Sequence, residues 1–176
     1  MREFEFKTTR GETIDNVIEY IKNRLENDEL KNDYQIYVGC DSLPTKKGTA
    51  TYSTVIVLYR VGKGAQILFN REKNIKVHGT TKRERMKNRL WEEIYRAVDV
   101  ALLLTDSDLF DNKQITDFQV HIDVNPNEDY ESNLIYKEAM GYLNSLGFDA
   151  YAKPEAMAAS YASDSICRGY TTKVND

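Results

Sequence analysis

Strand-like and helical segments follow one another in an order that limits the fold more than any other feature of the chain. Three short runs rich in aromatic and β-branched residues, "YQIYVGCD", "TYSTVIVLYR" and "AQILFN", lie between residues 34 and 70 with turn-like residues between them. From residue 81 on, long segments with apolar residues at helical spacing alternate with the strand-like runs "FQVHIDV" and "FDAYA". A meander followed by such alternation predicts an α/β fold, in which helices cover both faces of a mixed sheet.

Four segments have the apolar spacing of amphipathic helices. We expect the first over residues 13–26, within an N-terminal helical cover of residues 1–30. The other expected helices are residues 81–104, residues 130–146 with Gly147 as the C-terminal cap, and a last helix from Pro154 to its end at Gly169. Because no repeat or linker interrupts the 176 residues, we predict a single domain over residues 1–176.

Composition excludes several classes of protein. The chain is 41% hydrophobic and 30% charged, and no apolar run approaches the ~18 residues needed to cross a bilayer, so we expect no membrane partner. The N-terminal "MREFEFKTTR" has no apolar core of a signal peptide, which favours a cytoplasmic location. Cys40 and Cys167 form no metal-binding motif, and we expect both to be buried as small hydrophobic residues.

Positive charge is concentrated in one part of a chain whose net charge is −4. Residues 60–89 hold ten Lys or Arg but only two Glu. Such a basic segment is a candidate surface for nucleic-acid phosphates, and a solvated helix face is the alternative. The candidate nucleic-acid-binding residues near the start of the long helix are Lys82, Arg83, Arg85, Lys87 and Arg89.

Acidic residues stand where two of the predicted strands end. Asp41 ends the first strand of the meander, and Asp123 ends the strand "FQVHIDV". Ligands of such sheets bind beyond the carboxyl ends of neighbouring parallel strands, so the two carboxylates would lie close together if these strands are adjacent. Like charges at that distance require a cation or a raised pKa.

The helices supply two further acids. Glu93 falls on the apolar stripe of the long helix between Leu90 and Ala97, whereas Glu92 falls outside it, so Glu93 is expected to face inward. Asp164 lies among small residues of the last helix. Taken singly, each acid also fits a turn, a cap, an ion pair or a solvated position.

Together the four carboxylates predict an oxygen-rich site for hard cations. With no His or Cys cluster, the expected cofactor is Mg²⁺ or Mn²⁺, with two ions about 4 Å apart as in phosphodiester hydrolysis. The candidate catalytic and metal-binding residues are Asp41, Glu93, Asp123 and Asp164.

Five sequence blocks within residues 36–164 carry a resemblance to a known family: "IYVGCDS", "STVIVLYRVGKGAQ", "RLWEE", "VHIDVNPNEDYES" and "EAMGYLNSLGFDAYAKPEAMAASYASD". In these blocks the chain resembles the YkuK family of predicted ribonuclease-H-like nucleases. The resemblance implies a five-stranded mixed sheet flanked by helices, with the first and fourth strands adjacent and an extra N-terminal helix. It also implies divalent-metal nuclease chemistry with the same four acids.

Four further residues are auxiliary candidates. Well-studied ribonucleases H have a histidine in the loop before the last helix, where this chain offers Lys153. Ser42 could contact a phosphate or close the turn, and Asn125 could support the metal or cap the next helix. His121 is expected on the same strand face as Asp123, where it could shuttle a proton or be a hydrogen-bonded structural histidine.

These observations favour a divalent-metal-dependent nuclease that hydrolyses phosphodiester bonds of RNA, DNA or a hybrid. The alternative is a catalytically inactive ribonuclease-H-like module that binds nucleic acid or protein. A sugar-kinase-like or actin-like ATPase uses a similar sheet, but usually pairs two such domains, and the chain has no P-loop.

Overall fold

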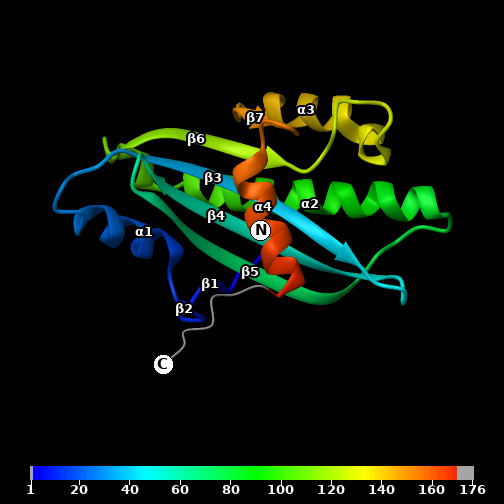
Figure 1. Ribbon diagram of the computed structural model, residues 1–176, viewed down its shortest axis with the longest axis horizontal. Coiled ribbons are helices and arrows are strands. Elements are labelled where there is room, and N and C mark those ends of the chain that lie inside the picture. Colours follow the sequence, from blue (N-terminus) through cyan, green and yellow to red (C-terminus); the bar gives the residue numbers. More distant parts are fainter. Residues whose placement is uncertain (1, 170–176) are drawn as a thin grey trace.

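All the strands that the structure describes belong to one mixed sheet (Figure 1). The structure is a computed structural model and describes residues 2–169, except the side chains of residues 157–159. The strand order is β2-β1-β5-β4-β3-β6-β7, with β6 parallel to both β3 and β7 and all other pairs antiparallel. The strands are β1 (Phe6–Thr8), β2 (Thr13–Ile14), β3 (Tyr34–Pro44), β4 (Thr49–Arg60), β5 (Gly64–Lys76), β6 (Ile115–Ile122) and β7 (Ala150–Tyr151). The predicted α/β fold class is therefore confirmed.

Helices cover both faces of this sheet. The α-helices are α1 (Val17–Glu26), α2 (Lys82–Thr105), α3 (Tyr136–Ser145) and α4 (Met157–Arg168), and the 3₁₀-helices are η1 (Asp108–Asp111) and η2 (Glu131–Ile135). Buried apolar residues of α1, α2 and α3 pack against one face in the main core. On the other face, Ala162 and Ile166 of α4 pack on Val55, Val57 and Phe69 in a smaller core.

The β3–β6 pairing positions the candidate site. The two strands run parallel as neighbours, and Cys40 of β3 pairs with Ile122 of β6. The residues that follow this pair, Asp41 and Asp123, therefore lie side by side at the end of the parallel pairing. Asp123 follows the end of β6, but the prediction that Asp41 ends its strand is wrong, because β3 continues to Pro44 by pairing with β4. The predicted adjacency of the first and fourth strands of the core is confirmed.

The N-terminal segment differs from the prediction. The sheet has seven strands rather than five, because residues 6–8 and 13–14 form a hairpin of two short strands that extends the sheet beside β5. Helix α1 begins at Val17 instead of residue 13, since the side chain of Asn16 accepts hydrogen bonds from the backbone N–H groups of Ile18 and Glu19.

The segment before α3 also differs. Residues 130–146 were expected to form one helix, but a 3₁₀-helix, η2, precedes α3. Local side-chain bonds explain the tighter start: the backbone N–H of Asn125 donates to Ser132 Oγ, and Asn133 Nδ2 donates to the carbonyls of Asn125 and Pro126. Gly147, with φ of 82°, follows α3 as predicted.

The last helix begins later than expected. A turn over residues 153–156 precedes α4, so the helix starts at Met157 rather than at Pro154. Its C-terminal cap is Gly169 in the left-handed conformation, as predicted. Both cysteines are free and buried, in agreement with the sequence analysis. Among the described helices none is long and apolar enough to span a membrane.

Candidate active site

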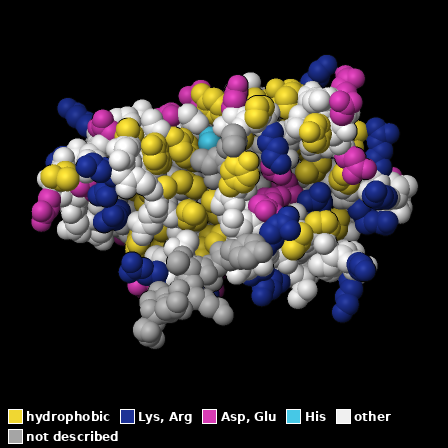
Figure 2. All heavy atoms as spheres, in the orientation of Figure 1, with side chains coloured by type: hydrophobic (Ala, Val, Ile, Leu, Met, Phe, Trp, Pro, Cys, Tyr) yellow, Lys and Arg dark blue, Asp and Glu magenta, His cyan; other side chains and the backbone are white. Residues whose placement is uncertain are grey.

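Four elements direct carboxylates into one cleft of about 950 Å³. Asp41 comes from β3, Glu93 from α2, Asp123 from the end of β6 and Asp164 from α4. Figure 2 shows acidic side chains gathered in a hollow of this face with basic side chains beside them. The structure thus brings together all four acids that the sequence analysis singled out; their catalytic role stays a prediction.

Glu93 is the most deeply buried of the four, with 4% of its surface exposed. Ser42 Oγ donates a hydrogen bond to Glu93 Oε1, and Arg89 Nη1 lies 2.8 Å from the same oxygen. Arg89 Nη1 also donates to Ser42 Oγ at 2.6 Å and to the Ser42 carbonyl at 3.2 Å. Arg89 and Glu93 lie one turn apart on α2, so their side chains are neighbours. Together with Ser42 of β3 they form a hydrogen-bonded triad at one end of the cleft.

Two other acids are also paired with basic side chains. Lys153 Nζ lies 2.6 Å from Asp123 Oδ1. Arg168 Nε, one turn after Asp164 on α4, lies 2.8 Å from both oxygens of that carboxylate. Three of the four acids therefore have an internal counter-ion.

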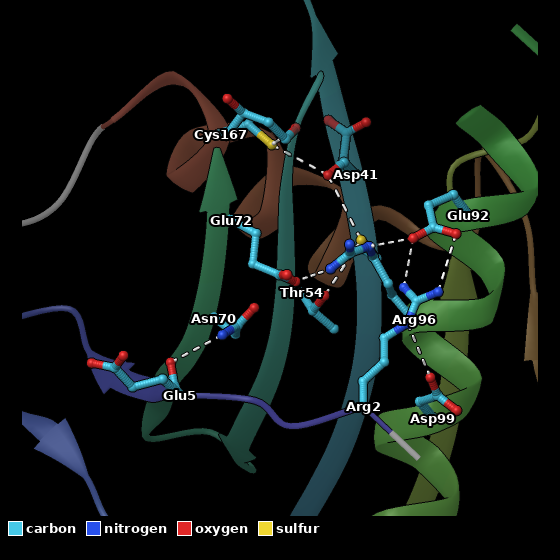
Figure 3. A network of polar contacts seen from close by, with 12 residues as sticks. Arg2, Glu5, Asp41, Thr54, Asn70, Glu72, Glu92, Arg96, Asp99 and Cys167 are labelled. Carbon is cyan, nitrogen blue, oxygen red and sulfur yellow. Dashed lines mark hydrogen bonds and ion pairs between the residues drawn. The ribbon is translucent and has the colours of Figure 1, made fainter. Parts of the chain in front are cut away.

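Two hydrogen bonds hold Asp41 in place, one to its side chain and one to its backbone carbonyl. Its Oδ1 accepts a hydrogen bond of 2.7 Å from the backbone N–H of Ser42. Its carbonyl accepts a bond of 3.2 Å from Cys167 Sγ, which links β3 to α4 (Figure 3). Arg71 of β5 holds the same turn of α4, because its Nη2 donates to the Cys167 carbonyl at 2.6 Å.

Burial and the repulsion between neighbouring acids raise the pKa values of two carboxyl groups in this cleft. Burial, followed by the charge of Asp123, raises the pKa of Asp41 from 3.8 to about 6. Burial also raises the pKa of Glu93 well above its usual range, although Arg89 opposes this effect. Burial alone would lower the pKa of Lys153, but its contact with Asp123 outweighs this and raises it. The site therefore holds negative charge at an energetic cost that a cation would reduce.

The donor chemistry of the four carboxylates fits a hard divalent cation, because all the donors are oxygens. Within residues 2–169, no group of three or more His, Cys, Asp or Glu side chains is arranged to hold a metal ion as it stands. Glu93, Asp123 and Asp164 instead form ion pairs with Arg89, Lys153 and Arg168. A cation bound here would take the place of at least one basic partner.

The predicted basic residues divide among several locations at the start of α2. Lys82, Arg85 and Arg89 line a groove of about 340 Å³ with Pro44, and this groove shares Pro44 and Arg89 with the acidic cleft. Arg83 lines a separate pocket of about 260 Å³. Lys87 contacts α3, where it lies 3.2 Å from Glu138. The groove and the acidic cleft therefore adjoin at Pro44 and Arg89, and Glu131 lies among the basic residues of the groove.

Three of the four auxiliary candidates line the cleft, and His121 does not. Ser42, Asn125 and Lys153 are part of its wall. His121 is buried, with its ring stacked on Tyr37 and its Nε2 2.8 Å from Gln119 Oε1. Because β6 ends at Ile122, strand alternation does not extend to Asp123. Burial lowers the pKa of His121 to about 4, which keeps the ring neutral in a structural position.

Two tyrosines of the cleft were missed by the sequence analysis. Tyr130 lies in the segment before η2, and Tyr161 lies on α4. The spacing of three residues between Tyr161 and Asp164 on a helix was a usable signal for the second. Nothing in the local sequence distinguishes Tyr130 from any other loop tyrosine.

Comparison with known proteins agrees with this architecture. The family model described as "Ribonuclease H-like" matches residues 16–168, which is most of the chain. Neither the comparison with curated proteins nor that with solved structures gave a match. The matched range includes every strand of the β3–β7 core and all four carboxylates of the cleft. The chain belongs to the ribonuclease H-like family.

Proposed function

We propose that this protein is a divalent-metal-dependent nuclease, of the kind expected for the YkuK family, and that its cleft hydrolyses phosphodiester bonds. The observation that carries the proposal is the convergence of Asp41, Glu93, Asp123 and Asp164 in one cleft that continues into a cationic groove. Membership of the ribonuclease H-like family supports it.

Each acid has a role in the proposal. Asp41 of β3 and Asp123, which follows the adjacent strand β6, would hold the cation, and Glu93 and Asp164 would complete its set of oxygen donors. When bound, Mg²⁺ or Mn²⁺ supplies Lewis-acid stabilisation of charge that develops on a phosphate. Lys82 and Arg85 would bind flanking phosphates along the groove, which favours recognition of the backbone over base sequence.

In the proposed nuclease, the basic residues that pair with the cleft acids have a second role. Arg89, Lys153 and Arg168 neutralise carboxylates in the free protein. Once a cation takes over this neutralisation, the charged groups of Arg89 and Lys153 become available to a phosphate at the same place. Of these, Lys153 stands where a histidine assists proton transfer in well-studied ribonucleases H.

A cleavage assay with a matched control tests the proposal. Wild type, Asp41→Asn, Asp123→Asn and the exposed control Asp111→Asn are incubated with labelled single-stranded, duplex, hybrid and junction substrates, each with Mg²⁺, Mn²⁺ or EDTA. Because a cation-holding carboxylate loses its charge, we expect both cleft variants to lose at least about 100-fold in rate. The control should cleave as wild type does, and EDTA should stop cleavage. Wild-type rates in Asp41→Asn would exclude the proposed site.

The internal ion pairs favour a second candidate, a catalytically inactive module that binds nucleic acid. In this case Arg89, Lys153 and Arg168 would be permanent counter-ions of the cleft acids. The same assay separates the two candidates, because the module would bind substrate without cleavage in any metal. Its binding would be lost on neutralising Lys82 and Arg85 and would persist in Asp123→Asn.

A further inference from the structure

Exposed aromatic rings are concentrated at the acidic cleft. Within residues 2–169, three tyrosines have large exposed side chains: Tyr95 at 44%, Tyr130 at 55% and Tyr161 at 64%. The two most exposed both line the cleft, whereas Tyr95 does not and packs on Trp91 and Tyr142 of an aromatic cluster. An exposed ring beside a substrate cleft is an available surface for stacking.

The two rings lie on different sides of the cleft. Tyr130 also lines the small pocket with Arg83 and Met86, which places it on the side of the α2 N-terminus. Tyr161 belongs to α4 and lies near Lys153, whose pKa it affects. The cleft wall therefore has one exposed ring from the segment before η2 and one from α4, and each ring shares its surroundings with a basic side chain.

The combination of exposed aromatic rings and basic side chains fits a nucleic-acid strand whose bases are unpaired. Every base has a π-face that can stack on an aromatic side chain, while its phosphates require cations. In a duplex these faces are already stacked on neighbouring base pairs and are not accessible to a protein side chain. A cleft lined by both cationic and exposed aromatic groups thus favours single strands over duplexes.

We propose that Tyr130 and Tyr161 are base-stacking residues that make the cleft specific for single-stranded nucleic acid, with one unpaired base held on each side of the phosphate at the carboxylates. This inference rests on the proposed function in that the ligand is nucleic acid. It adds the strandedness of the substrate and two residues that recognise it.

Binding measurements test this inference apart from cleavage. Single strands and duplexes carrying the fluorescent base 2-aminopurine are titrated with protein in the Asp41→Asn background, with Mg²⁺ present. The compared variants are Tyr130→Ala, Tyr161→Ala, the matching Tyr→Phe changes, and Tyr95→Ala as an exposed tyrosine outside the cleft. Each alanine change should weaken single-strand binding by roughly 5- to 100-fold. The Phe variants and Tyr95→Ala should bind as the background does, with 2-aminopurine fluorescence quenched.

Strands with an abasic spacer provide a second, independent readout. An abasic spacer at the stacked position should weaken binding to the Asp41→Asn background protein by the same factor as the alanine change. In the matching alanine variant, the spacer should have no further effect on binding. Full-strength single-strand binding by Tyr130→Ala and Tyr161→Ala, or equal affinity for duplex and single strand, would overturn the inference.

The two proposals fail in different ways. Cleavage by wild type together with unaltered binding by both alanine variants would retain the nuclease and reject base stacking. Stacking without cleavage in any metal would reject the nuclease and retain recognition of single strands by an inactive module.

Discussion

At the scale of single residues, the acids of the cleft lower the stability of the folded protein because they hold negative charge away from water. Asp41 and Glu93 are buried carboxylates whose pKa values lie above their usual range because burial and neighbouring acids oppose ionisation. Helical phase identified Glu93 correctly as the inward member of the Glu92–Glu93 pair, since it is 4% exposed. A stripe of apolar residues at helical spacing is a local property and can be followed in sequence.

A prediction for Asp41→Asn follows from its pKa. The folded state raises this pKa from 3.8 to about 6, so the folded protein binds the proton more tightly than the unfolded chain does. The carboxylate therefore has no destabilising effect below about pH 4 and its full effect above about pH 6. In EDTA at about pH 8, the free energy of unfolding of Asp41→Asn should exceed that of wild type by about 1–2 kcal/mol.

Urea unfolding at several pH values measures this difference. The advantage of Asp41→Asn should decrease as the pH falls and disappear near pH 4. The exposed control Asp111→Asn should show no such trend. Equal free energies of unfolding at about pH 8 would contradict the assignment of Asp41 as a destabilised carboxylate.

At the scale of elements, buried ion pairs fix α2 against the sheet and so position Glu93. The Arg96 side chain is 4% exposed, forms ion pairs with Glu72 of β5 and Glu92 of α2, and lies 4.5 Å from the centre of the Tyr52 ring. Figure 3 shows Arg2 on the other side of Glu92, with hydrogen bonds of 2.7 and 3.1 Å to its two oxygens. Glu92 directly precedes Glu93 on α2, and Arg96 lies one turn after it.

Arg96→Met should therefore destabilise the fold. The change removes two ion pairs and a cation–π contact from a buried position, at an expected cost of about 2–4 kcal/mol in the free energy of unfolding. Arg96→Lys retains the charge without the planar fork and should lose only part of this energy. Thermal unfolding of both variants provides the comparison, and a Met variant as stable as wild type would show that packing alone holds α2.

At the scale of the whole molecule, the basic segment of the sequence divides between two ends of the sheet. Arg60 pairs with Gly64 at one end of the β4–β5 hairpin, and Thr49 pairs with Lys76 at the other. Lys82 and Arg85 follow at the second end, beside the cleft. Lys82 and Arg85 therefore lie beside the cleft and Arg60 lies at the far end, while Arg71 lies between them, paired with Ser53.

The salt dependence of binding distinguishes the two ends. For single strands, each phosphate contact contributes about 0.7 to the slope of log affinity against log salt, so the double variant Lys82→Ser, Arg85→Ser should lower that slope by about 1.4. The control double variant Arg60→Ser, Lys63→Ser removes the same charge from the far end and should leave the slope unchanged. Equal decreases of the slope in both variants would indicate that the net charge of the protein determines the salt dependence, and that nucleic acid does not bind specifically in the groove.

The sequence by itself determined the order of the main helices and strands from β3 on and the inward phase of Glu93, because helical and strand periodicity are local. It did not determine the hairpin of β1 and β2 or the extension of β3 beyond Asp41, because both depend on pairing with other strands. Only the tertiary structure decided that β3 and β6 are neighbours, which brings Asp41 and Asp123 side by side. It also decided the pairing of Lys153 with Asp123, since contacts between residues remote in sequence depend on how the chain packs. Tertiary packing likewise decided the place of His121, whose buried ring stacks on Tyr37 outside the cleft.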